Sequence, residues 1–410
     1  AASNSLEFYA VGKLLGKGAF GKVNVGVHKL TEEIVALKLC ERRRITEVGA
    51  KKCLMQEVGL IKRLTGHPNI IQLFEVVETA TQIVLVMEFA SGGDLLRFVR
   101  QRRRLAEPTT KDLFKQIMDG LSHIHAMSVV HRDIKLENLL LDSFGCVKIA
   151  DFGVAMVMQP GKRLHEHCGT PSYIAPEILM EAGYEGEPVD VWSSGIVLYA
   201  MLCGRVPFKG EHLSDLKRCI LRGRFHFPPH LSQPACAIIN SMLILEPRRR
   251  ATVPEVIGHR FLEGIENRAE MLYSHMLRSQ PPEEGMPEGR LVLPPGDSAA
   301  RALLEKVSEF GFPVASLEES LSEGKFDHAT ATFHLLSQQV TRKQAAALAP
   351  SGPPGSGAAV RGTSHPPAGE DHEDEDNDDD DGQLEGHLTT GKGGASLIDW
   401  QIRSPVSPVE

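Results

Sequence analysis

Apolar and polar residues alternate over several short stretches near the start of the chain, which is the period of half-buried β-strands. These stretches are 9–15, 23–27, 35–39, 73–77 and 83–88, with one helical pattern between them at 51–64. Beyond residue 91 apolar positions recur every three or four residues, as in amphipathic helices. The helical stretches are 110–125, 189–202, 213–221 and 233–243. The pattern predicts an α+β fold with a small β-rich lobe (8–90), a larger helical lobe (91–262) and a ligand cleft between them.

The sequence after residue 262 predicts three further segments. Repeated prolines, four of them in two Pro-Pro pairs, predict a linker at 263–297. Helical patterning returns at 298–340 and predicts a module of three short helices with a turn at Gly311-Phe312. Residues 341–410 are rich in Gly, Pro and acidic residues. Because such a composition cannot bury enough apolar surface to offset the entropy of ordering, we expect a disordered tail.

Net charge, cysteine spacing and the length of apolar runs limit the partners and the cellular compartment that we expect. The formal net charge is -8, and the acidic run at 370–381 accounts for all of it. Small basic clusters at 42–44 and 102–104 are typical of solvated helix ends, so we expect no nucleic-acid partner. The seven cysteines are scattered and indicate reduced thiols in a cytoplasmic or nuclear protein. No apolar run reaches 18 residues, so we expect no membrane span.

Gly16, Gly18 and Gly21 form the spacing G-x-G-x-x-G. Dinucleotide-binding folds share this spacing, but they place it between a strand and a helix. Here strand-like residues flank the glycines on both sides, which indicates a hairpin. A glycine-rich hairpin lets backbone N–H groups approach the oxygens of a triphosphate.

Ionisable residues at fixed spacings suggest phosphate chemistry. Lys38, at the end of a predicted buried strand, needs an anionic partner, and Glu57 in the next helix can supply it. Asp133 can accept a proton from a substrate hydroxyl group. Asn138 and Asp151 offer the oxygen ligands that Mg²⁺ prefers.

Together these residues make up ordered motifs. They are Val35-Ala36-Leu37-Lys38, His131-Arg132-Asp133, Asp151-Phe152-Gly153 and Ala175-Pro176-Glu177. Their order and spacing resemble the eukaryotic protein kinase family. The resemblance implies the two-lobed kinase fold, with ATP and Mg²⁺ as cofactors and protein substrates as partners.

The same resemblance assigns roles to individual residues. Lys135 indicates Ser/Thr specificity, and Thr170 would bridge Asp133 and Lys135. Asp190 would anchor the catalytic loop, and Arg250 would pair with Glu177. The candidate catalytic residues are Asp133, Lys135, Lys38, Asn138 and Thr170, and the candidate metal ligands are Asn138 and Asp151. The candidate nucleotide-binding residues are Leu15, Gly16, Lys17, Gly18, Ala19, Phe20, Gly21, Lys22, Val23, Ala36, Lys38, Glu57, Met87, Glu88, Ala90, Asp94, Glu137, Leu140 and Asp151.

Within that set, the resemblance places Val23 and Ala36 above the adenine and Leu140 below it, with Met87 at the back and a backbone hinge at 88–90. Asp94 and Glu137 would bind the ribose and Arg residues N-terminal to the phosphoacceptor. An alternative is that both are ordinary surface carboxylates.

The residues of several motifs, such as Leu136-Glu137-Asn138-Leu139-Leu140, resemble those of the calcium/calmodulin-dependent kinase group and its AMP-activated protein kinase-related branch. Residues 298–340 then resemble a ubiquitin-associated-like module, which we expect to pack on the back of the kinase domain and to offer a site for a regulatory partner. A generic helical tail is the alternative.

Between Phe152 and Gly169 there is no Ser, Thr or Tyr. Where the resembled branch carries a phosphorylatable Thr, this chain has Glu166. We expect Glu166 to supply a fixed negative charge to Arg132, unless it is simply a solvated carboxylate. The alternative function, a kinase-fold scaffold or pseudokinase, is disfavoured because the motif residues Lys38, Glu57, Asp133, Asn138 and Asp151 are all present.

Overall fold

The computed structural model describes residues 5–17, 21–44, 48–159, 161–180, 183–273 and 298–348. The predicted disordered tail beyond residue 348 and most of the predicted linker lie outside the described residues. None of the described helices is long and apolar enough to cross a membrane.

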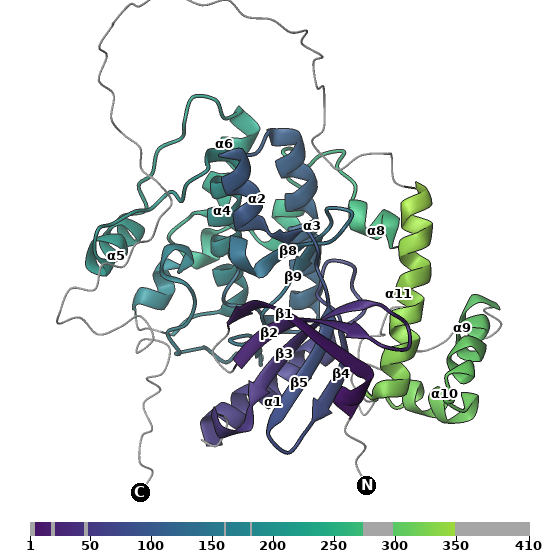
Figure 1. The fold of residues 1–410 in the computed structure, drawn as a ribbon. Coiled ribbons are helices and arrows are strands. Elements are labelled where there is room, and N and C mark those ends of the chain that lie inside the picture. Colours follow the sequence, from purple (N-terminus) through teal and green to yellow (C-terminus); the bar gives the residue numbers. More distant parts are fainter. Residues whose placement is uncertain are drawn as a thin grey trace, which may run out of the picture. The chain divides into compact units, whose positions relative to one another are not determined.

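Five antiparallel strands form the sheet of the small lobe, in the order β1-β2-β3-β5-β4 (Figure 1). They are β1 (Tyr9–Lys17), β2 (Gly21–His28), β3 (Ile34–Glu41), β4 (Leu73–Glu78) and β5 (Gln82–Glu88). The helix α1 (Val48–Leu64) lies between β3 and β4 in the sequence. All five predicted strands and the predicted helix are therefore present, each one to three residues longer at one or both ends.

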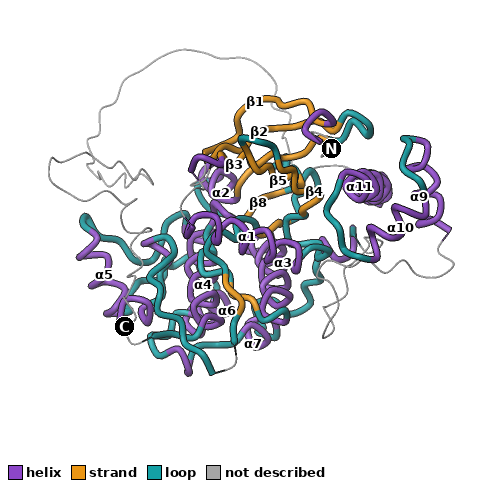
Figure 2. Tube along the Cα trace, turned by 90° about the horizontal axis from the view of Figure 1, so that it is seen from below, coloured by secondary structure: helices purple, strands orange, loops and turns teal. Residues whose placement is uncertain are grey.

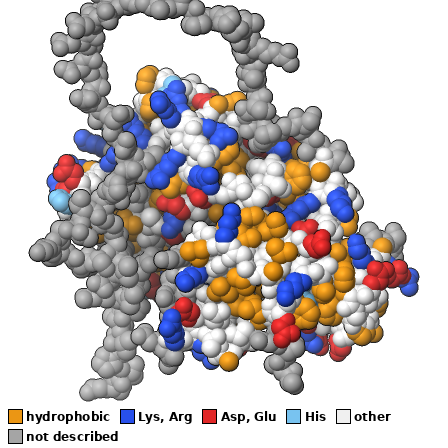
Figure 3. Space-filling model, viewed as in Figure 1, with side chains coloured by type: hydrophobic (Ala, Val, Ile, Leu, Met, Phe, Trp, Pro, Cys, Tyr) orange, Lys and Arg blue, Asp and Glu red, His pale blue; other side chains and the backbone are white. Residues whose placement is uncertain are grey.

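The central strands are buried on both faces. In β5, Leu85 packs in the same core as Leu54 of α1, whereas Val84 and Val86 belong to a second core on the opposite face of the sheet. This explains why β5 is apolar almost throughout instead of alternating. The strands β1 and β2 are less covered, with Val11, Leu14 and Val27 exposed, and hydrophobic side chains are visible on the surface over this lobe (Figure 3).

The large lobe is mainly helical. Its helices are α2 (Leu95–Arg102), α3 (Glu107–Ala126), α4 (Gly186–Cys203), α5 (Leu213–Arg222), α6 (Gln233–Met242), α7 (Val253–Ile257) and α8 (Arg268–Leu272). Short strands complete it: β6 (Gly93–Asp94) with β8 (Leu139–Leu141) and β9 (Val147–Ile149), and β7 (Val129–Val130) with β10 (Met156–Val157). The helix α4 is buried along most of its length, and its Trp192 stacks on Phe208 with ring centroids 5.7 Å apart. The predicted fold class, a β-rich lobe followed by a helical lobe, is confirmed.

The helix α8 falls in the segment that we expected to be a linker. Asn267 caps it by accepting hydrogen bonds from the backbone N–H groups of Ala269 and Glu270. Tyr273 packs in a small core with Cys146, and its hydroxyl donates to Asp142 at 2.5 Å. Residues up to Tyr273 therefore pack on the large lobe.

Three helices follow: α9 (Ser298–Glu309), α10 (Val314–Ser322) and α11 (His328–Leu348). They enclose a core of their own that includes Val307, Leu317 and Phe333. Gly311, with φ of 94°, makes the turn between α9 and α10 at the expected Gly-Phe pair. The third helix is not short. It has 21 residues and ends eight positions after the expected boundary at 340.

The helix α11 lies along β4 on the face of the sheet opposite α1 (Figures 1 and 2). Its Ala331 and Leu335 join the second core of the small lobe. At the far end of this contact Arg342 pairs with Glu33 at 2.7 Å. The three-helix module therefore contacts the small lobe through both apolar and charged side chains.

Candidate active site

Lys38 and Glu57 meet between β3 and α1, as their spacing predicted. The Nζ atom of Lys38 lies 2.5 Å from Oε1 of Glu57 and 3.9 Å from Oδ1 of Asp151. Burial alone would lower the pKa of Lys38, but the charges of Glu57 and then of Asp151 raise it above its ordinary value. The ammonium group is thus held charged at a fixed position facing Asp151.

Asp133 stands at the centre of a hydrogen-bonded group. Lys135 Nζ donates to its Oδ2 at 2.8 Å, and Thr170 Oγ1 donates to its Oδ1 at 2.8 Å. The amide of Asn138 donates to the Asp133 carbonyl at 2.9 Å and to Oδ2 at 3.1 Å. Lys135 also donates to Thr170 at 2.8 Å. The predicted catalytic residues of this loop are therefore brought together.

The backbone of this loop is fixed by Asp190, which is fully buried in α4. Its two carboxylate oxygens accept the backbone N–H groups of His131 and Arg132 at 2.9 and 2.8 Å. The ring of His125 lies 2.9 Å from the same carboxylate. Burial opposes ionisation, but the hydrogen bond and charge of His125 outweigh it and lower the pKa of Asp190. Sequence reasoning found Asp190 but missed His125.

Arg132 and Asp151 both adopt positive φ, at 65° and 64°. Residues other than glycine adopt this conformation only where the surroundings hold them there, and such strain concentrates at functional sites. For Arg132 those surroundings include the Asp190 carboxylate and a hydrogen bond from its Nε to the carbonyl of Val154 at 2.7 Å.

Arg250 and Glu177 form the expected pair in the large lobe. The two guanidinium nitrogens donate to the two carboxylate oxygens at 2.6 and 2.9 Å, and both side chains are buried. Such a bidentate pair is geometrically specific. It holds Glu177 in place, at the end of the segment from Asp151 to Glu177, which is called the activation segment below.

The strands β1 and β2 flank the predicted glycine-rich hairpin on both sides, in agreement with the expectation. Of its residues, Gly18, Ala19 and Phe20 lie outside the described part of the chain. A Cβ atom at Gly21 would come 1.7 Å from the carbonyl oxygen of Leu39, so β3 excludes any side chain there. Gly16 has open space around it. Of the two motif glycines that the structure describes, Gly21 is required by packing, whereas Gly16 needs another explanation, such as room for a ligand.

The apolar residues predicted to surround adenine come from β2, β3 and β5 of the small lobe and from β8 of the large lobe. Ala36 pairs with Met87 in the β3–β5 register, and Val23, Met87 and Leu140 are half-buried. Half-buried apolar side chains are what an open apolar slot requires. Leu15 and Lys22 are exposed at the rim.

Glu88 does not offer its side chain to a ligand. Its carboxylate lies 2.9 Å from Lys148 Nζ and accepts a hydrogen bond from Gln338 of α11 at 2.9 Å. Glu88 and Lys148 are both almost completely buried. Glu88 can therefore contact a nucleotide only through its backbone, as expected for a hinge residue.

Asn138 and Asp151 fit a magnesium ion by their chemistry. The amide nitrogen of Asn138 is used by Asp133, which leaves its oxygen for a cation, and the Asp151 side chain is 54% exposed. The described residues contain no cluster of three His, Cys, Asp or Glu side chains that could hold a metal. Two protein oxygens are nevertheless sufficient for Mg²⁺, because water and phosphate oxygens complete its shell.

Glu166 lies next to the catalytic loop. Its Oε2 is 3.2 Å from Arg132 Nη1, and Tyr184 donates its hydroxyl hydrogen to the Glu166 carbonyl at 2.8 Å. Arg132 also donates to the Tyr184 hydroxyl at 3.3 Å. Gly169 has a φ of 103°, and a Cβ atom there would come 2.9 Å from the carbonyl oxygen of Arg132. The sequence predicted the Glu166 contact but not the part played by Tyr184.

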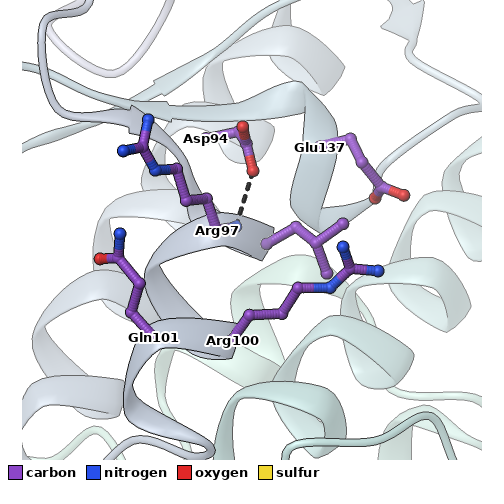
Figure 4. Close-up of a pocket in the computed structure, with 6 residues that line it drawn as sticks. Asp94, Arg97, Arg100, Gln101 and Glu137 are labelled. Atoms are coloured by element: carbon purple, nitrogen blue, oxygen red, sulfur yellow. Dashed lines mark hydrogen bonds between the residues drawn. The ribbon is translucent and has the colours of Figure 1, made fainter. Parts of the chain in front are cut away.

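Asp94 and Glu137 line one hollow beside the start of α2 (Figure 4). Asp94 is the N-cap of that helix and accepts the backbone N–H of Arg97 at 2.7 Å. Sequence reasoning placed these two carboxylates in a substrate groove, and it missed the two arginines, Arg97 and Arg100, that line the same hollow.

Comparison with known proteins agrees with this geometry. The protein kinase domain model matches residues 9–262, well over half of the chain. The chain belongs to the protein kinase family. The chain is similar to Serine/threonine protein kinase OSK4 of Oryza sativa subsp. indica, with 37% identity over 340 residues, 82% of this chain and 62% of that protein. Serine/threonine protein kinase OSK3 of the same subspecies is also 37% identical, over 82% of this chain and 63% of its own length. The chain thus spans less than two thirds of these curated relatives.

Proposed function

We propose that this kinase transfers the γ-phosphate of ATP to Ser and Thr hydroxyl groups of protein substrates. The observation that carries the proposal is the hydrogen-bonded group of Asp133, Lys135 and Thr170, which joins the catalytic loop to the activation segment. The Ser/Thr assignment is supported by Lys135 and by the printed names of the relatives.

Each residue has a role in such a transfer. Asp133 accepts the proton of the attacking hydroxyl group, and Lys135 neutralises charge that develops on the phosphoryl oxygens. Lys38, held by Glu57, orients the phosphates, and Asp151 and Asn138 are the residues that would hold Mg²⁺. Bound Mg²⁺ supplies positive charge that offsets the charge of the phosphate groups. The half-buried apolar residues around Ala36 bind the adenine.

Asp94 and Glu137 support a preference for substrates with basic residues N-terminal to the phosphoacceptor. Both carboxylates are accessible and lie beside the catalytic loop. A basic side chain bound there would gain two charge-assisted hydrogen bonds.

The experiment is an incorporation assay with Mg²⁺-ATP and a Ser peptide carrying an N-terminal Arg. We expect wild-type protein to phosphorylate it, and Asp133→Asn to lose about 10²- to 10⁴-fold in kcat, because the proton acceptor is removed without a change of shape. Asp215→Asn, an exposed carboxylate of α5, is the matched control and should retain wild-type turnover. Equal measurable turnover in wild type and Asp133→Asn would refute the role of Asp133. Absence of turnover in wild type would refute the proposed transfer and favour a scaffold function.

The activation segment supports partial activity without phosphorylation. We infer that Glu166 serves as a built-in anion for Arg132, because its carboxylate lies where charge can hold that arginine. Its single charge is smaller than the −1.5 to −2 charges of a phosphate group.

The three-helix module after the kinase domain supports membership of the AMP-activated protein kinase-related branch of the calcium/calmodulin-dependent kinase group. In that branch the module is ubiquitin-associated-like, and here it offers a surface for a regulatory partner while its helix α11 is held against the small lobe. A cytoplasmic or nuclear location remains a prediction from the scattered cysteines.

A further inference from the structure

A hollow of about 310 Å³ opens beside α2 and next to the catalytic loop. Its walls carry charges of both signs: the carboxylates of Asp94 and Glu137 and the guanidinium groups of Arg97 and Arg100 (Figure 4). A basic side chain alone would be attracted by the carboxylates and repelled by the arginines. The hollow therefore fits a ligand that carries both charges.

The orientation of α2 places the arginines in the hollow. Leu95 and Val99 are buried and fix the inner face of the helix. Arg97 and Arg100 are three residues apart and so share one exposed face. Arg102 does not line the hollow, and its guanidinium instead stacks on Phe98, 3.8 Å from the centre of the ring.

The hollow adjoins the reacting group. Glu137 lies in the turn Leu136–Asn138, and Asn138 donates to Asp133 at 3.1 Å. Tyr173 is buried. Burial raises its pKa, as do the charges of Glu137 and Asp133, while Arg100 opposes them. Because Glu137 lines the hollow and the next residue, Asn138, contacts Asp133, a peptide whose hydroxyl group reaches Asp133 passes within reach of the hollow.

The two arginines differ in their surroundings. Figure 4 shows the Arg100 side chain extending towards Glu137. The Arg97 side chain extends away from Glu137, on the side of Asp94 and Gln101. Both arginines are exposed, and Arg97 is the one that does not extend towards Glu137. Its guanidinium is thus the positive group that an incoming anion meets.

We propose that Arg97 selects protein substrates with an acidic side chain beside the basic one, so that the hollow binds a segment carrying both charges. The proposal rests on the proposed function, since it names the substrate class of the same site. An aspartate, a glutamate or a phosphoserine can provide the anion, because all three present oxygens that a guanidinium binds.

The test uses the full chain and Ser peptides that contain one Arg, with Glu, phosphoserine or Gln scanned through the other positions. At one position we expect the Glu peptide to have a KM roughly fivefold lower than the Gln peptide, the upper range for an exposed ion pair, with kcat unchanged. Arg97→Glu should reverse this preference and favour Lys at the same position. A larger gain from phosphoserine than from Glu would identify a phosphorylated substrate as the source of the anion.

The matched control is Arg102→Glu, which makes the same charge change on the same helix but outside the hollow. It should keep the wild-type ratio of KM values. An equal Glu-to-Gln ratio in wild type and Arg97→Glu, or an equal change in Arg102→Glu, would overturn the proposal while leaving Ser/Thr transfer intact. Absence of transfer to every peptide by wild type would overturn the proposed function itself and the subsite with it.

Discussion

Glu166 places a carboxylate 3.2 Å from the guanidinium of Arg132, directly before the catalytic Asp133. The Glu166 side chain is 53% exposed, whereas Arg132 is 6% exposed. Solvent screens a pair that is exposed on one side, so its contribution falls in the range of about 0.2–1 kcal/mol. The charge therefore contributes to ordering the loop without being its only support, because Tyr184 and Asp190 also hold Arg132 in place.

Replacing Glu166 by Gln should lower kcat roughly two- to fivefold, because an ion pair of this strength is lost while the shape remains. Steady-state phosphorylation of a peptide, by protein expressed without an upstream kinase, measures the effect. Glu187→Gln, an exposed glutamate in the first turn of α4, is the control. Glu166→Thr should lose as much activity and regain it once that Thr is phosphorylated. Wild-type kcat in Glu166→Gln would show that the segment is ordered by packing alone.

At the residue scale, the sequence predicted side chains that belong to linear motifs and missed those that support them from elsewhere. Lys38 and Asp133 stand in motifs whose spacing is informative. His125, Tyr184 and Arg97 do not, because a lone His, Tyr or Arg in a helix or loop has many ordinary uses. Their roles depend on which segments the fold brings together.

At the scale of elements, strands were predicted closely because alternation and burial leave a clear pattern in the small lobe. The helix α2 was missed because only Leu95 and Val99 of its eight residues are buried. The helix α11 was predicted too short for a similar reason. Its last turns hold Ala, Lys, Gln and Arg, which favour helix through their intrinsic propensity and carry no apolar stripe.

The contact between α11 and the sheet depends on Leu335, which is fully buried in the second core of the small lobe. Leu335→Ala should reduce the stability of this contact by about 2–5 kcal/mol, since it removes buried apolar area and leaves a cavity. Hydrogen exchange of the α11 and β4 amides measures the change locally. Val340→Ala, on the same helix and 40% exposed, should change the exchange by less than about 0.5 kcal/mol. Equal protection in both variants would mean that the module is a tether that does not depend on this core.

At the scale of the whole molecule, the module and the small lobe share a buried cluster of ionisable groups. His28 is fully buried, with Nδ1 2.8 Å from the Thr31 hydroxyl. The rings of Tyr9 in β1 and His328 in α11 lie 5.2 and 5.0 Å from it. Glu75 in β4 accepts the Tyr9 hydroxyl at 2.5 Å and lies 3.3 Å from His328 Nδ1. The cluster thus joins three strands of the sheet and one helix of the module.

Burial, and then the charge of His328, lowers the pKa of His28 to about 4. In the unfolded chain a histidine titrates near 6.5, so above that pH both states are neutral and His28 has no effect. As the pH falls from 6.5 towards 4, the unfolded chain binds a proton that the folded protein cannot, and stability is lost. At pH 5.5 the loss should be about 1.4 kcal/mol. The measurement is the difference in unfolding free energy between pH 7.5 and 5.5 for wild type and for His28→Asn, which keeps a partner for Thr31 but does not titrate. His28→Asn should lose about 1.4 kcal/mol less unfolding free energy than wild type on this acidification. An identical loss in both proteins would show that His28 accepts its proton within the folded protein.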